Sequence, residues 1–77
     1  MRVWTDYPIV ELGDTPNQRA PIRECSVIAY DGDKYATVVI CGVETSFKAG
    51  YLYTEMGRCG EVPRVPLKDL ERLPYRT

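Results

Sequence analysis

Apolar and polar positions alternate with a period of two along much of this chain, which is the pattern of half-buried β-strands. The alternation is clearest in residues 22–30, where Cys25, Val27 and Ala29 share one face and Tyr30 lies on the other. Residues 35–41 are the most apolar and β-branched stretch, with both faces suited to burial, so we interpret them as the central strand. The other expected strands are residues 1–7, an edge strand at 9–12, residues 43–53 and a brief strand at 64–66.

Glycine, proline and aspartate separate these segments. Asp31-Gly32 is a strong signal for a hairpin turn, because both residues tolerate a positive φ. Gly42 permits a tight turn, and Gly50 marks a bend within its strand. Two longer segments, residues 13–21 and residues 54–63, have the composition of loops. After Pro66, the leucines at 67, 70 and 73 recur every three residues, which predicts one or two turns of helix.

The closing segment, residues 64–73, reads Arg-Val-Pro-Leu-Lys-Asp-Leu-Glu-Arg-Leu. It resembles the closing segment of many Src-homology-3-like barrels, and the Asp-Gly hairpin fits that plan. The resemblance implies a mainly β fold over residues 1–77: one small five-stranded barrel with a short C-terminal helical turn. A closed barrel also leaves few unpaired strand edges. The resemblance to these barrels implies no activity.

One enzyme family on this fold, the plasmid-borne type II dihydrofolate reductases, is similar to this chain in length and in its closing Leu-Glu-Arg run. The pore motif of that family, Val-Gln-Ile-Tyr, is absent. Val62-Pro63-Arg64-Val65 occupies the comparable place. We therefore carry over no catalytic residue from the reductases.

Composition narrows the class of protein further. The chain has 77 residues, 44% of them hydrophobic and 27% charged, as in an ordinary soluble domain. The net charge of −1 disfavours nonspecific nucleic-acid binding, which requires a basic excess. No apolar run is long enough to span a membrane, and the N-terminus does not have the pattern of a signal peptide. We therefore expect a cytoplasmic protein.

The sequence offers little material for catalysis or for metal binding. It lacks histidine, the commonest general base and metal ligand. The three cysteines are an odd number at wide spacing, which fits neither a disulfide framework nor a zinc site. We interpret Cys25 and Cys41 as small core residues. Asp31 and Asp33 fit a hairpin better than a metal clamp, so we expect no metal, no cofactor and no catalytic set.

The best candidates for a binding site are aromatic. The chain has six tyrosines and one tryptophan, which can form a groove for a proline-rich peptide or a modified lysine. The segment Gly57-Arg58-Cys59-Gly60 is most simply a flexible hairpin loop. Its functional alternatives are an anion-binding backbone nest and a reactive thiol. The candidate binding residues are therefore Trp4, Tyr30, Tyr51, Tyr53, Arg58 and Cys59.

These observations favour a non-enzymatic module that binds a protein partner or another copy of itself. We expect the loops at residues 13–21 and 54–63 to carry the surface, since loops on a rigid scaffold commonly do. One alternative is an oligomeric small-ligand binder or enzyme with a shared pore. Another is a nucleic-acid binder, if the ten basic residues gather on one face. By association with other chains of this size, a mobile genetic element is a plausible origin.

Overall fold

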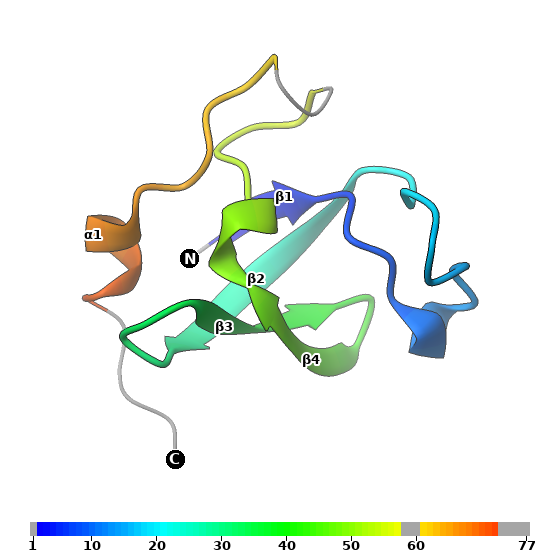
Figure 1. The fold of residues 1–77 in the computed structure, drawn as a ribbon, viewed down its shortest axis with the longest axis horizontal. Coiled ribbons are helices and arrows are strands. Elements are labelled where there is room, and N and C mark those ends of the chain that lie inside the picture. Colours follow the sequence, from blue (N-terminus) through cyan, green and yellow to red (C-terminus); the bar gives the residue numbers. More distant parts are fainter. Residues whose placement is uncertain (1, 58–60, 73–77) are drawn as a thin grey trace.

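The computed structural model describes residues 2–57 and 61–72, and it is mainly β (Figure 1). Four antiparallel strands form one sheet in the order β1-β2-β3-β4. The elements are β1 (Arg2–Thr5), the 3₁₀-helix η1 (Val10–Leu12), β2 (Arg23–Tyr30), β3 (Tyr35–Ile40), β4 (Val43–Lys48), the 3₁₀-helix η2 (Ala49–Tyr51) and α1 (Leu67–Leu70). In the view of Figure 1 the loop of residues 6–22 lies at the right and helix α1 at the left.

Strand β3 lies between β2 and β4, which confirms its prediction as a central strand. One of its faces, formed by Ala36, Val38 and Ile40, is fully buried in the core. On the other face Tyr35 is exposed, so the expectation that both faces are buried is wrong. The apolar core joins this strand to side chains from almost every other element: Val3, Ile9, Cys25, Val27, Tyr30, Phe47, Ala49, Leu52, Val65 and Leu70.

A bulge in β2 changes which of its residues face the core. The register shifts between Val27, which pairs with Val38, and Ala29, which pairs with Thr37. One inserted residue reverses the alternation beyond it, so Tyr30 pairs with Ala36 and is buried. The predicted placement of Tyr30 on the face opposite the Cys25 face is therefore wrong. The period-two pattern carries no sign of the bulge.

Two tight turns connect the three strands after residue 22. Asp31-Gly32 begins the β2–β3 hairpin as predicted, with Gly32 at φ 81°. Cys41 and Gly42 form the β3–β4 turn, with φ of 49° and 81°. Positive φ at two consecutive residues is what a two-residue hairpin with a type I′ turn requires. Cys41 is exposed in this turn, so its prediction as a core residue is wrong, whereas Cys25 is buried as predicted.

Residues 9–12 form no edge strand. The N–H of Leu12 donates to the carbonyl of Ile9 at 2.9 Å, and that of Gly13 donates to the carbonyl of Val10 at 2.9 Å, which closes the 3₁₀-helix η1. Ile9 is buried and Val10 is exposed. The apolar pattern of residues 9–12 therefore fits a tight turn after the buried Ile9 as well as it fits a strand.

After η2 the chain returns to β1. Tyr53 forms an isolated antiparallel bridge with Trp4 and another with Arg64. Within the described residues these bridges take the place of the expected fifth strand. Helix α1 confirms one turn of the predicted helix and buries Leu70 in the core. Leu73 lies outside the described residues.

Candidate functional site

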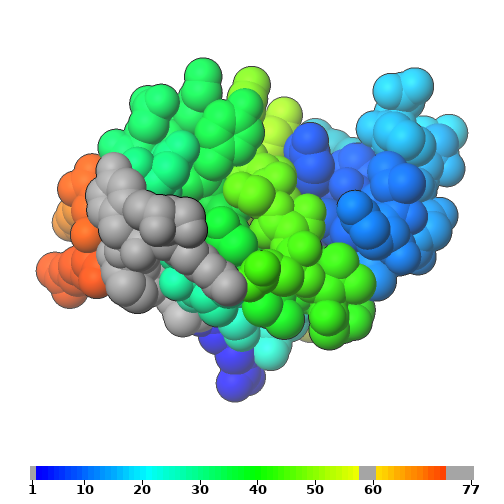
Figure 2. Space-filling view, turned by 90° about the horizontal axis from the view of Figure 1, so that it is seen from below, coloured from blue at the N-terminus to red at the C-terminus, as the bar shows by residue number. Residues whose placement is uncertain are grey.

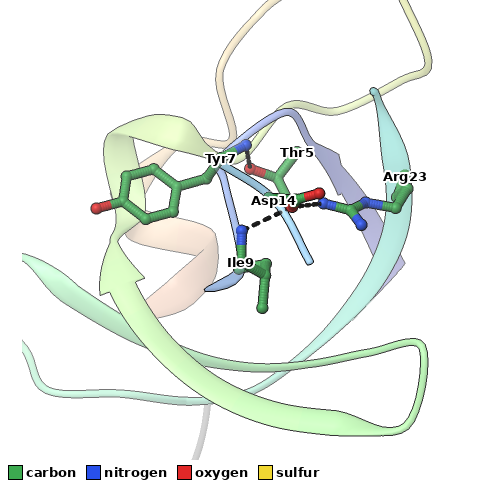
Figure 3. Close-up of polar contacts among 5 residues, drawn as sticks. All are labelled: Thr5, Tyr7, Ile9, Asp14 and Arg23. Carbon is green, nitrogen blue, oxygen red and sulfur yellow. Dashed lines mark hydrogen bonds and ion pairs between the residues drawn. The ribbon is translucent and has the colours of Figure 1, made fainter. Parts of the chain in front are cut away.

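The loop of residues 6–22 is held in shape by Asp14 (Figure 3). Its Oδ2 accepts the N–H of Ile9 at 2.7 Å and pairs with the guanidinium of Arg23 at the start of β2. Both charged side chains are largely shielded, with 12% of Asp14 and 21% of Arg23 exposed. The Ile9 N–H, and then the Arg23 guanidinium, lower the pKa of Asp14 against the opposing effect of burial. The Asp14 carboxylate in the middle of the loop thus connects Ile9, near the start of the loop, to Arg23, which directly follows it.

Thr5 connects the start of this loop to η2. Its hydroxyl donates to the carbonyl of Tyr51 at 2.6 Å and accepts the N–H of Tyr7 at 3.1 Å. Thr5 is fully buried, so both hydrogen bonds are shielded from water. One side chain therefore fixes two tyrosines that stand 44 positions apart in the sequence.

The rings of these two tyrosines meet on a buried support. Tyr7 stacks on Phe47 with ring centroids 4.7 Å apart and planes at 10°. It meets Tyr51 at 4.8 Å and 51°. Phe47 is buried in the core, whereas Tyr51 is 42% exposed. The pair presents aromatic surface to solvent while its position is fixed from below.

A groove of about 320 Å³ opens between this pair and the loop. We call it the aromatic groove, and its lining residues are Asp6, Tyr7, Pro8, Pro16, Asn17, Gln18, Arg19 and Tyr51. Figure 2 shows the blue segment of the loop beside the yellow-green segment that follows β4. Arg19 Nη1 lies 3.9 Å from Asp6 Oδ2, at the outer limit of an ion pair. Because the contact is this long and the Arg19 side chain is 72% exposed, the pair contributes little to stability.

A second groove, of about 460 Å³, also uses Tyr51. We call it the basic groove, because Lys34, Lys48 and Arg64 contribute to its walls. Its remaining lining residues are Asp33, Ala49, Gly50, Tyr51, Val65 and Leu67. Tyr51 is therefore common to two recesses of different chemical character.

The predicted site residues do not form one cluster. Tyr51 lines both grooves, and in the aromatic groove it is joined by residues of the predicted loop at 13–21. Tyr30 is buried and donates its hydroxyl to the carbonyl of Asp33 at 2.7 Å. Tyr53 is also buried and exchanges backbone hydrogen bonds with the half-buried Trp4, at 2.8 and 3.0 Å. Arg58 and Cys59 lie outside the described residues, and a binding role for all six stays a prediction.

Sequence reasoning missed Tyr7, Asp6 and the three cations of the basic groove. Tyr7 precedes a proline, and this context marks the end of a strand rather than a site. Its partnership with Tyr51 depends on tertiary structure. A useful signal was available in the loop itself, because Pro16 and Pro8 bring apolar surface to a segment otherwise rich in polar residues.

Of the two described cysteines, Cys25 is buried and Cys41 is exposed. Burial, with a smaller contribution from the Glu24 charge, raises the pKa of the Cys25 thiol to about 11. Cys25 is therefore a protonated thiol at neutral pH and a weak nucleophile. Among residues 2–57 and 61–72, no three His, Cys, Asp or Glu side chains gather in a way that would hold a metal ion.

The helices of the described segments are too short to cross a membrane. A comparison with known proteins adds no family: no family model, curated protein or solved structure matches this chain. The functional proposal therefore rests on the residues that line the aromatic and basic grooves.

Proposed function

We propose that this protein is a peptide-binding module that holds an extended, proline-containing segment of a protein partner in the aromatic groove. The observation that carries the proposal is the Tyr7–Tyr51 pair, which is exposed at its surface and stacked on the buried Phe47. A polyproline II segment is already extended in solution, so it loses little conformational entropy on binding. Aromatic-lined grooves are the usual docking sites for such segments.

We further propose that the fold belongs to the Src-homology-3-like barrels. Supporting this are the order of the elements and the return of the chain to its first strand. A long loop follows β1, three antiparallel strands follow the loop, and η2 leads into Tyr53, which pairs with Trp4 of β1. In this arrangement the long loop and η2 flank one surface. That surface contains the aromatic groove.

The groove has the features that a proline-rich ligand needs. Tilted tyrosine rings offer flat faces for proline rings, and the hydroxyl groups stay available for hydrogen bonds to peptide carbonyls. Asn17 and Gln18 add amide donors and acceptors along the opposite wall. The side chains that support the tyrosines are buried, so the surface is organised before a ligand arrives.

Fluorescence anisotropy with a labelled, uncharged peptide of Pro-Leu-Pro-Pro repeats, about ten residues long, tests the proposal. Replacement Tyr51→Ala removes half of the aromatic pair, and we expect it to weaken binding by about tenfold or more. Tyr35→Ala is the matched control, because Tyr35 is equally exposed, at 42%, but lines neither groove. Equal effects of the two replacements, or no binding by the unmodified protein, would contradict the proposal.

A further inference from the structure

The basic groove adjoins the aromatic groove at Tyr51, which lines both, and it has a different charge. Its three cations come from separate parts of the fold. Lys34 ends the β2–β3 turn, Lys48 ends β4, and Arg64 forms the bridge with Tyr53. Within residues 2–57 and 61–72, the ion pairs are Arg2–Glu24, Arg19–Asp6 and Arg23–Asp14, and none of them uses a cation of this groove.

The nearby carboxylates offset only part of this positive charge. Asp33 is the one acidic residue in the lining, so the groove has three positive charges and one negative charge among its described residues, a balance of +2. Asp31 stands close enough for the Lys34 charge to act on it. Asp31 therefore offsets part of the Lys34 charge, and counting it leaves a balance of +1. Its Oδ1 also accepts three backbone N–H groups, from Asp33, Lys34 and Tyr35. This excess of positive charge contrasts with the net charge of −1 for the whole chain.

Apolar side chains lie between the cations. Ala49 and Val65 are buried at the base, while Leu67 is 50% exposed and Tyr51 is 42% exposed. A nucleic-acid strand would use the charge but leave the leucine surface without a partner. A peptide with a carboxylate beside an apolar side chain matches both features.

We propose that the peptide bound in the aromatic groove runs past Tyr51 into the basic groove, where it places at least one carboxylate next to an apolar residue. This inference rests on the proposed function, because the two grooves share Tyr51 as a lining residue and therefore adjoin each other. The partner is thus a proline-containing segment flanked by an acidic-apolar one. The aromatic groove binds the proline-containing part of the peptide, and the cations favour an acidic sequence next to it.

The test uses three labelled peptides with the same neutral proline-rich segment. One has no extension, one carries Asp-Leu-Glu at each end, and one carries Lys-Leu-Lys at each end. Each surface cation contributes a few tenths of a kcal/mol to about 1 kcal/mol, or about threefold in affinity, so two of them give a preference of about tenfold. We expect the acidic peptide to bind about tenfold more tightly than the basic one, with the difference shrinking as salt is added.

Charge reversal locates the preference. Lys48→Glu and Arg64→Glu change exposed side chains in the groove, and each is expected to reduce the preference by about threefold or more. Lys68→Glu makes the same change at an exposed position of helix α1 whose side chain lines neither groove, and it is the matched control. Circular dichroism verifies that each variant is folded.

The outcomes separate the two proposals. If the neutral peptide binds but charge makes no difference, or if Lys68→Glu acts as strongly as Lys48→Glu, this inference is wrong and the proposed function stands. If only the acidic peptide binds, the preference of the basic groove for acidic residues is supported, but the proline site in the aromatic groove is wrong. If no peptide binds, both are wrong. Competition by a thymidine oligonucleotide that surpasses the acidic peptide at equal charge would overturn the choice of a peptide.

Discussion

Two aspartates order two loops of this protein, and they reach very different distances along the chain. In the β2–β3 turn, Asp31 Oδ1 accepts the N–H groups of Asp33, Lys34 and Tyr35 at 2.8, 2.9 and 3.0 Å. In the long loop, Asp14 reaches back five residues to the N–H of Ile9 and forward nine residues to Arg23. These hydrogen bonds of Asp31 stay within residues 31–35, whereas the contacts of Asp14 join the long loop to the start of β2.

This difference bears on function, because the aromatic groove is built on the second loop. Thr5 accepts the N–H of Tyr7, and Phe47 supports the Tyr7 ring from the core. The contact between Asp14 and Arg23 ties down the loop that supplies the rest of the wall. A surface of this kind exists only when distant segments are assembled. The Asp31 turn contributes a cation to the basic groove but needs little help from the rest of the chain.

The largest expected effect is at Ile9, the buried anchor of the long loop. Replacement Ile9→Ala removes packed methyl groups and should reduce the free energy of unfolding by about 2–4 kcal/mol. Lys34→Ala in the exposed short turn should change it by less than about 0.5 kcal/mol. Urea unfolding followed by circular dichroism measures both. Similar effects would show that the two loops depend on the core alike. Ile9→Val, at about 1 kcal/mol, is the milder variant if Ile9→Ala is unfolded.

The next effect concerns the local character of the short turn. Gly32 has φ of 81°, a conformation in which a side chain costs about 1–2 kcal/mol, so Gly32→Ala should destabilise the protein by that amount. Gly50→Ala is the control, since Gly50 is not among the glycines with positive φ and an added Cβ there meets no atom within 4 Å. Thermal unfolding of the two variants gives the comparison. Equal midpoints would contradict the assigned turn.

Thr5 gives a smaller effect on the side of the long loop. Thr5→Val keeps the shape of the side chain but removes its hydrogen bonds to Tyr51 and Tyr7, at a cost of about 1 kcal/mol. Thr54→Val removes an exposed hydrogen bond to the Pro63 carbonyl and should cost less. We expect Thr5→Val also to weaken binding of the neutral peptide, whereas Thr54→Val should not. Unchanged binding by a folded Thr5→Val variant would separate the hydroxyl from the groove.

The smallest effect is the response to acid. Backbone N–H groups, that of Ile9 for Asp14 and that of Asp33 first for Asp31, lower the pKa of each carboxyl below 3.8 in the folded protein. The unfolded chain therefore binds more protons as pH falls past 3.8, so this part of the stability is present above that pH and lost below it. Urea unfolding from about pH 2 to about pH 6 should show the loss in the unmodified protein. Asp14→Asn and Asp31→Asn should each show a shallower decline, and parallel curves for all three would refute the pKa assignment.

Local signals in the sequence predicted a good part of the fold. Asp31-Gly32, the β-branched run of β3, the bend at Gly50 and the leucines of α1 each act within a few residues, and the structure has the corresponding elements. The errors occur where a local pattern has two solutions. Ile9 and Leu12 fit either a strand or a 3₁₀-turn, and Cys41 continues the apolar run of β3 although the turn begins there.

The candidate site was harder to predict, because its contacts are between distant segments. Tyr51 was predicted from its residue type and its place near the loop at 54–63, but Tyr7 has no signal of its own without Thr5 and Phe47 beside it. Tyr30 and Tyr53 show the reverse problem, since a tyrosine in a strand reads the same whether it is buried or exposed. The bulge that buries Tyr30 leaves no mark on the hydrophobic pattern.

The most direct test of the central claim compares Asp14→Asn with Asp31→Asn in binding the neutral proline-rich peptide. The measurement is made by anisotropy, at a temperature where urea curves show both variants to be folded. The account predicts that Asp14→Asn weakens binding by about tenfold, because the wall of the aromatic groove depends on the Asp14–Arg23 contact, while Asp31→Asn binds like the unmodified protein. Equal affinities for the two variants, or a larger loss for Asp31→Asn, would contradict it.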